Sequence, residues 1–199
     1  MSIEETLLEK GVWPICGVDE AGRGPLAGPV AAAAVIITPG SEIRRQMKDS
    51  KQIAPAKRER LYELIIHSPN IYVGISLVDV LIIDEINIRQ ATLVAMKNAV
   101  SKLGLKPACA LIDGNAIPDL PCDSIAVVKG DITEPSISAA SIVAKVTRDR
   151  YMIRMDRIYP GYGFARHKGY PTSGHYAAIR RQGISPIHRR SFKCVRREY

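Results

Sequence analysis

The chain has 199 residues, which is enough for one domain with a sizeable buried core. Hydrophobic residues make up 46% of the sequence and charged residues 24%, so the composition excludes an intrinsically disordered chain. The 28 Lys and Arg residues outnumber the 20 Asp and Glu residues, and the net charge of +8 favours an anionic partner, either nucleic acid or a membrane surface.

Cysteine usage and the N-terminus indicate the compartment. The cysteines are dispersed without a C-x-x-C pair, and no histidines stand at zinc spacing; the four are Cys16, Cys109, Cys122 and Cys194. We therefore expect free thiols in a reducing compartment. Residues 1–10 are charged and lack the apolar core of a signal peptide, and no apolar run reaches membrane-spanning length. The sequence thus predicts a cytoplasmic protein without membrane association.

Apolar patterns predict five strands, at residues 15–20, 29–38, 71–78, 108–112 and 124–128. Helices are expected at about 55–66, 80–103 and 133–158, with shorter ones at 2–10 and 173–181. A short glycine-rich loop joins the first two strands, so the second should run antiparallel to the first. We predict an α/β fold with a five-stranded mixed sheet and helices on both faces, formed by residues 1–170. A basic helical C-terminal extension, 171–199, would pack against it.

Carboxylates follow three of the predicted strands: Asp19 with Glu20, Asp113 and Asp131. If these strands are neighbours, the four acids meet at one edge of the sheet and repel each other unless divalent cations bind. Oxygen ligands favour Mg²⁺ or Mn²⁺, and two such ions can drive phosphodiester hydrolysis without a protein nucleophile. Adjacent side chains on a regular strand face opposite ways, so either the strand twists at Glu20 or only one of Asp19 and Glu20 is a ligand.

The first strand runs into a loop in which Gly22, Gly24 and Gly28 fall within seven positions. Such a loop lets a ligand approach the main chain closely and exposes N–H groups that can hold phosphate oxygens. A tight hairpin turn with a surface acid is the alternative. For Asp113, the alternative is a capping or turn role.

The stretch Asp19-Glu20-Ala-Gly-Arg-Gly-Pro-Leu-Ala-Gly-Pro-Val30 resembles the signature of the ribonuclease HII family. Further segments are similar to that family, namely Ile-Asp113-Gly-Asn115, Lys-Gly-Asp131, residues 136–149, His-Lys-Gly-Tyr170-Pro-Thr and residues 185–192. The resemblance implies a ribonuclease H-like fold with a catalytic domain at 1–170. It implies an endonuclease that hydrolyses the RNA strand of RNA/DNA hybrids and nicks 5′ of ribonucleotides embedded in duplex DNA. Two Mg²⁺ or Mn²⁺ ions would be held by the four acids, and the products would carry 3′-hydroxyl and 5′-phosphate ends.

The resemblance also assigns substrate contacts. Gly22-Arg23-Gly24 and Tyr170 stand where the family senses the ribose 2′-hydroxyl, the group that distinguishes RNA from DNA. The other candidates for substrate contact are Asn115, Lys51, Lys145, Arg148 and Arg189. The basic ones could instead be solvated surface charges, and His175 and His188 could be structural or touch phosphate.

Other interpretations stay open. Glu134 could be an extra metal ligand, although an acid in the first turn of a helix is favoured. A nucleic-acid-binding module would use the acids as turns and caps, and a phosphatase of small phosphoesters would leave the basic residues without a role. The related ribonuclease HIII is less favoured because Asp131 stands where that relative typically has glutamate. We expect a monomer, and the C-terminal residues to Tyr199 contain no clear clamp-binding motif.

Overall fold

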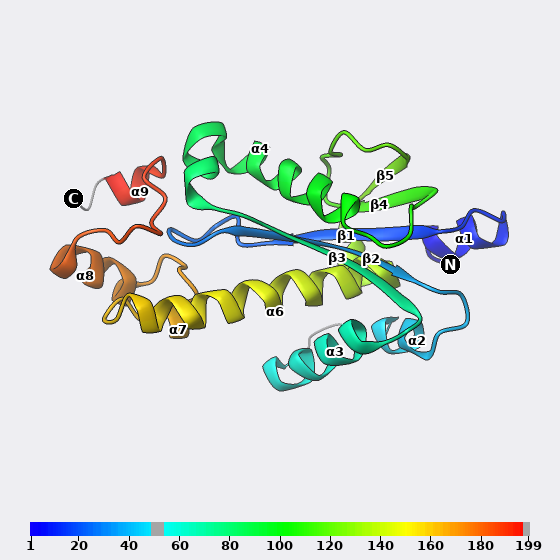
Figure 1. Ribbon diagram of the computed structural model, residues 1–199, viewed down its shortest axis with the longest axis horizontal. Coiled ribbons are helices and arrows are strands. Elements are labelled where there is room, and N and C mark those ends of the chain that lie inside the picture. The colour runs from blue at the N-terminus through cyan, green and yellow to red at the C-terminus, as the bar shows by residue number, and fades with distance from the viewer. Residues whose placement is uncertain (49–53, 197–199) are drawn as a thin grey trace.

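The computed structural model describes residues 1–48 and 54–196, which form a five-stranded sheet flanked by helices (Figure 1). The strand order across the sheet is β3-β2-β1-β4-β5. The strands are β1 (Ile15–Ala21), β2 (Val30–Ile37), β3 (Ile71–Val78), β4 (Cys109–Asp113) and β5 (Asp123–Val127). β2 pairs antiparallel with both neighbours, whereas β1, β4 and β5 run parallel to one another. The predicted mixed sheet with an antiparallel second strand is therefore confirmed.

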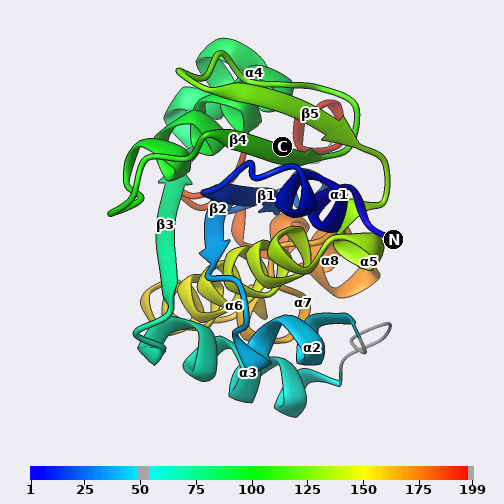
Figure 2. The ribbon, with the colours of Figure 1, turned by 90° about the vertical axis from the view of Figure 1, so that its right-hand side faces the viewer.

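Helix α4 (Val80–Ser101) covers one face of the sheet and α6 (Pro135–Ile158) covers the other (Figure 2). β2 is buried along its whole length. Its Ala32 and Ala34 pack in the cluster on the α4 face, and Ala33 and Val35 pack in the cluster on the α6 face. Burial on both faces explains why this strand is an unbroken apolar run. Helices α2 (Glu42–Lys48) and α3 (Pro55–His67) pack on the outer side of α6.

The start of α6 lies directly against β1. A Cβ added at Gly17 would lie 2.1 Å from the main-chain nitrogen of Ile137, so only glycine permits this approach. The helix predicted at 133–158 is α6, which begins at Pro135, and a separate short helix that the sequence did not predict, α5 (Gly130–Thr133), precedes it. Glu134 between them is extended because the following Pro135 disfavours a helical residue before it.

Helix α4 is kinked at Asn87, which the sequence did not predict. Asn87 has φ 66° and ψ 162°, and its side-chain oxygen accepts hydrogen bonds from the main-chain N–H groups of Arg89 and Gln90. Asparagine therefore caps the second half of the helix in the manner of an N-cap. The kink places Arg89 next to the acidic strand ends described below.

Short helices occupy both ends of the described chain. The two short helices expected at 2–10 and 173–181 are present: α1 (Ile3–Glu9) is capped by Ser2, and α8 (Ser173–Gln182) is capped by Thr172. Helices α7 (Phe164–His167) and α9 (Lys193–Arg196) are single turns that the sequence did not predict. All four cysteines are free thiols, as expected. Within residues 1–48 and 54–196, no helix has both the length and the apolar character needed to cross a membrane.

Candidate active site

The predicted acids meet at one end of the sheet. Val18 pairs with Ile112, so Asp19 and Asp113, one residue further on, leave neighbouring parallel strands side by side. Asp131 follows β5 in the short helix α5, and the main-chain N–H of Gly130 donates to the Asp113 carboxylate at 2.7 Å. The parallel order of β1, β4 and β5 thus brings acids together that lie over a hundred positions apart in sequence.

Strand β1 stays regular through Ala21, so Asp19 and Glu20 leave it on opposite faces. Asp19 is 6% exposed, and Ser141 of α6 hydrogen-bonds to its carboxyl. Glu20 lies on the α4 face and forms an ion pair of 3.2 Å with Arg23. The strand therefore does not twist out at Glu20, and the two acids approach Asp113 from different sides.

The acids influence one another's ionisation. The pKa of Asp19 is raised well above its ordinary value by burial and then by the charges of Glu20 and Asp113. Burial likewise raises the pKa of Glu20, although the positive charge of Arg23 opposes this. The pKa of Asp113 is raised by burial and by the charge of Asp131. A nearby cation would reverse these shifts, and carboxylate oxygens are the donors that hard divalent ions prefer.

The acids are neighbours but do not form a ready-made cage. Among the described residues, no group of three Asp, Glu, His or Cys side chains is already arranged to hold a metal ion. Carboxylate oxygens are suitable ligands for a divalent metal ion. To bind one, however, the carboxylate groups must move closer to one another than they are in this structure.

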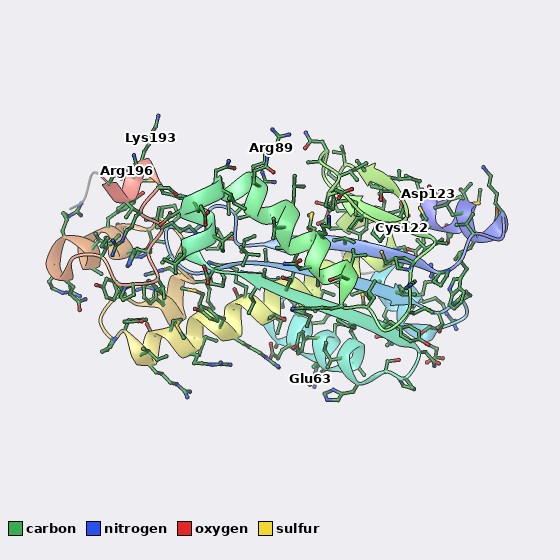
Figure 3. All side chains as sticks on the ribbon, turned by 45° about the horizontal axis from the view of Figure 1, so that its top comes forward. Glu63, Arg89, Cys122, Asp123, Lys193 and Arg196 are labelled. Atoms are coloured by element: carbon green, nitrogen blue, oxygen red, sulfur yellow. The ribbon has the colours of Figure 1, made fainter. Side chains whose placement is uncertain are left out.

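A cleft of about 390 Å³ opens beside these acids on the α4 side. It is lined by Glu20 and Asp113 together with Arg23, Arg89 and Asn115. Asn115, predicted from its motif, is exposed at this cleft. Arg89 projects from α4 (Figure 3) and was missed, because a single arginine on an outward helix face looks like any solvated charge.

The loop of residues 22–29 and Tyr170 lie next to each other, as the resemblance implies. A Cβ on Gly24 would lie 3.7 Å from the Tyr170 ring, which is 39% exposed. The ammonium of Lys145 lies 5.7 Å from the centre of that ring and also pairs with Asp149 at 2.8 Å. Gly24, Tyr170 and Lys145 therefore share one surface.

Two predicted substrate contacts, Arg148 and Arg189, are corrected by the structure. Their side chains are 1% and 0% exposed. Arg148 donates at 2.9 to 3.0 Å to the carbonyl oxygens of Pro29, Ala27 and Lys168. Arg189 donates at 2.6 to 3.2 Å to carbonyl oxygens of Gly22, Arg23, Gly28 and Pro29. Both guanidinium groups hold the loop from inside and cannot reach a duplex backbone.

Two further predictions have different outcomes. Lys51 lies outside the described residues. Glu134 is 2% exposed, and its carboxylate accepts hydrogen bonds from the main-chain N–H groups of Ile3 and Glu4 at 3.2 and 2.8 Å. In return, the Glu4 carboxylate accepts from the Ser136 N–H at 3.0 Å. Glu134 therefore lies just before α6 and not in its first turn, contrary to the favoured interpretation, and its carboxylate instead binds the N-terminus of α1, so its oxygens are already used.

Comparisons with known proteins identify one family. The family model for ribonuclease HII matches residues 16–195. The ribonuclease HII of Coxiella burnetii is 55% identical over 182 residues, which cover 92% of this chain and 89% of the relative. That of Polynucleobacter necessarius is 50% identical over 190 residues, covering 94% and 95% of the two chains.

Solved structures give the same result. The ribonuclease H2 of Pyrococcus horikoshii superposes with a TM-score of 0.78 at 30% identity, covering 92% of this chain and 96% of that one. The ribonuclease HII of Archaeoglobus fulgidus, solved in complex with PCNA, superposes with a TM-score of 0.77 at 25% identity, covering 93% and 96%.

Proposed function

Because the chain belongs to the ribonuclease HII family of metal-dependent nucleases that cleave the RNA strand of RNA/DNA hybrids, we propose that it also nicks duplex DNA at embedded ribonucleotides. Cleavage would occur on the 5′ side of the ribonucleotide and leave 3′-hydroxyl and 5′-phosphate ends. The observation that carries this proposal is the meeting of four acids beside the loop of residues 22–29 and Tyr170.

Asp19, Glu20, Asp113 and Asp131 are the proposed ligands of two Mg²⁺ or Mn²⁺ ions. Such ions supply an activated water and stabilise the departing oxygen. The raised pKa values of Asp19, Glu20 and Asp113 support this role, because burial and, after it, neighbouring carboxylates disfavour their charged forms, and a bound cation would oppose both effects. Asp19 and Glu20 leave β1 on opposite faces, so a site with all four ligands requires one of these two side chains to turn toward the other at the strand end; if neither turns, only one of them is a ligand.

The substrate would lie across the loop and the cleft. Gly22 and Gly24 allow a close approach of the backbone, and the exposed Tyr170 ring beside Gly24 would contact the ribose. Arg23, Lys145 and Asn115 would contact the phosphates and the strand around the scissile bond. Arg89 lines the same cleft as Arg23 and Asn115 and would add positive charge there. Lowering the salt concentration should therefore tighten binding.

The test uses three end-labelled duplexes: DNA with one ribonucleotide, all-DNA, and a continuous RNA/DNA hybrid. Each is incubated with Mg²⁺, Mn²⁺ or a chelator. We expect metal-dependent cleavage of the hybrid and a single nick 5′ of the lone ribonucleotide, with all-DNA left intact. Cleavage of the hybrid alone would refute the nicking proposal and keep the family activity. Binding without cleavage in every metal would instead favour a nucleic-acid-binding module.

We propose that the protein acts as a monomer in the cytoplasm, where its four free thiols would stay reduced. The Archaeoglobus fulgidus ribonuclease HII was solved in complex with PCNA. The present sequence offers no clear clamp-binding motif at its C-terminus, so no clamp partner is proposed.

A further inference from the structure

A chain of buried histidines lies behind Tyr170. His175 of α8 and His188 are 0% and 1% exposed, and their Nε2 atoms lie 3.0 Å apart. At one end of the chain, the main-chain N–H of Ser185 donates to Nδ1 of His188 at 2.8 Å. At the other end, Nδ1 of His175 lies 3.0 Å from the carbonyl oxygen of Tyr170. The two imidazoles thus connect residue 185 to residue 170.

The partners fix where each hydrogen lies. Because Nδ1 of His188 accepts from Ser185, the hydrogen of this ring is on Nε2 and is donated to His175. Nε2 of His175 is then the acceptor, so its hydrogen is on Nδ1 and is donated to the Tyr170 carbonyl. Burial lowers the pKa of both rings to about 4, so both are neutral near pH 7, as this arrangement requires.

The main chain at Tyr170 is held from the other side by the loop of residues 22–29. The N–H of Leu26 donates to the Gly169 carbonyl at 2.7 Å. Gly169 has φ +81°, and a Cβ there would lie 2.5 Å from the Ala27 carbonyl oxygen. The segment 169–170 is therefore clamped between the loop and the histidines, while the Tyr170 ring remains exposed beside Gly24.

Packing alone does not require this arrangement. The histidines pack against the ring of Phe164, at 5.5 and 5.7 Å between ring centres, in a site where apolar side chains would fill the same space. Burying two imidazoles has a desolvation cost that each hydrogen bond must offset. The polar chain ends at Ser185 on one side and, on the other, at the carbonyl group of Tyr170, the residue that would contact the ribose.

We propose that His175 and His188 are positioning residues that set the location of Tyr170 against Gly24 and so make recognition of the ribonucleotide selective. This inference rests on the proposed function, because it assumes that Tyr170 contacts the ribose. It assigns the two histidines no contact with substrate or metal.

The test is a double-mutant cycle on cleavage of DNA containing one ribonucleotide. His175→Leu removes the donor to Tyr170, whereas His175→Asn keeps a donor close to the position of Nδ1. We measure kcat/KM for each in the wild-type background and in Tyr170→Ala, well below the melting temperatures. We expect His175→Leu to reduce kcat/KM on the order of tenfold in the wild-type background, and to have no further effect in Tyr170→Ala. His175→Asn should restore part of the loss.

Two controls separate the possible failures. His67→Leu replaces an exposed histidine that bonds within α3, and should not change kcat/KM. His188→Leu removes the donor to Nε2 of His175 and should lower kcat/KM if His175→Leu folds poorly, whereas His188→Gln keeps a donor and should lose less. Equal losses from His175→Leu in both backgrounds would overturn the inference and leave the proposed function intact. If Tyr170→Ala alone has no effect on nicking, the ribose-sensing role fails and the inference fails with it, whereas cleavage of the hybrid would still report the nuclease.

Discussion

Replacing Arg189 with Met tests whether this buried guanidinium supports the loop of residues 22–29 or reaches the substrate. Met keeps much of the side-chain volume but donates no hydrogen bonds. The buried carbonyls of Gly22 and Gly28 would lose their partner, and the part-buried carbonyl of Arg23 would lose one bond. Each buried acceptor left unsatisfied costs roughly 1–3 kcal/mol, so the free energy of unfolding should fall by about 3–5 kcal/mol.

For a chain of this size, that loss corresponds to a melting temperature lower by about 10 °C. Arg190→Met is the matched control, since the neighbouring side chain is exposed and its substitution should change stability by less than about 0.5 kcal/mol. Thermal unfolding followed by circular dichroism measures both. If Arg189→Met has the same melting temperature as Arg190→Met but binds the duplex more weakly at low salt, then Arg189 contacts phosphate. The interpretation that its buried guanidinium supports the loop would then be wrong.

Three further predictions follow from the charges and caps. Unfolded histidines take up protons near pH 6.5, but His175 and His188 do so at about 4 when folded, so stability should fall as pH drops from 6.5 to 4. The melting temperature measured against pH should lose most of this slope in a His175→Asn, His188→Gln double variant. Added Mg²⁺ or Mn²⁺ should raise the melting temperature of the wild type more than that of Asp113→Asn; an equal rise would place the ion elsewhere. Glu134→Ala should reduce the free energy of unfolding by about 1–3 kcal/mol by uncapping α1, whereas exposed Glu9→Ala should not, as denaturant titration would report.

The strands and the strand-end acids could be predicted because each is a local signal. An apolar run that ends in an acid is visible in the sequence at Asp19 and at Asp113. The parallel order of the strands then places these ends together without further information. The start of α6 could also be predicted, since Glu134-Pro135 is a signal for a helix N-terminus, whereas the short helix α5 begins without a capping side chain and could not.

The roles of Arg148 and Arg189 could not be predicted, because a sequence does not distinguish an arginine buried among carbonyl groups from one on the surface. Apart from Lys168, their partners are main-chain oxygens of a loop over a hundred residues away, and such acceptors leave no trace in residue types. The histidine chain was hidden for the same reason, since one end of it is the carbonyl of Tyr170. Contacts between a side chain and a distant part of the main chain can be identified only when the fold is known.

The most direct test of the central claim compares Asp113→Asn with Asp119→Asn on duplex DNA containing one ribonucleotide. Asp119 lies six residues after Asp113 in the chain and is an exposed acid paired with Lys97. It serves as the matched control. We predict that Asp113→Asn lowers kcat/KM on the order of a hundredfold or more in Mg²⁺ or Mn²⁺ while its affinity for the duplex is kept, and that Asp119→Asn cleaves like the wild type. Undiminished cleavage by Asp113→Asn, or an equal loss of cleavage, binding and melting temperature, would contradict the claim that the strand-end acids form the active site.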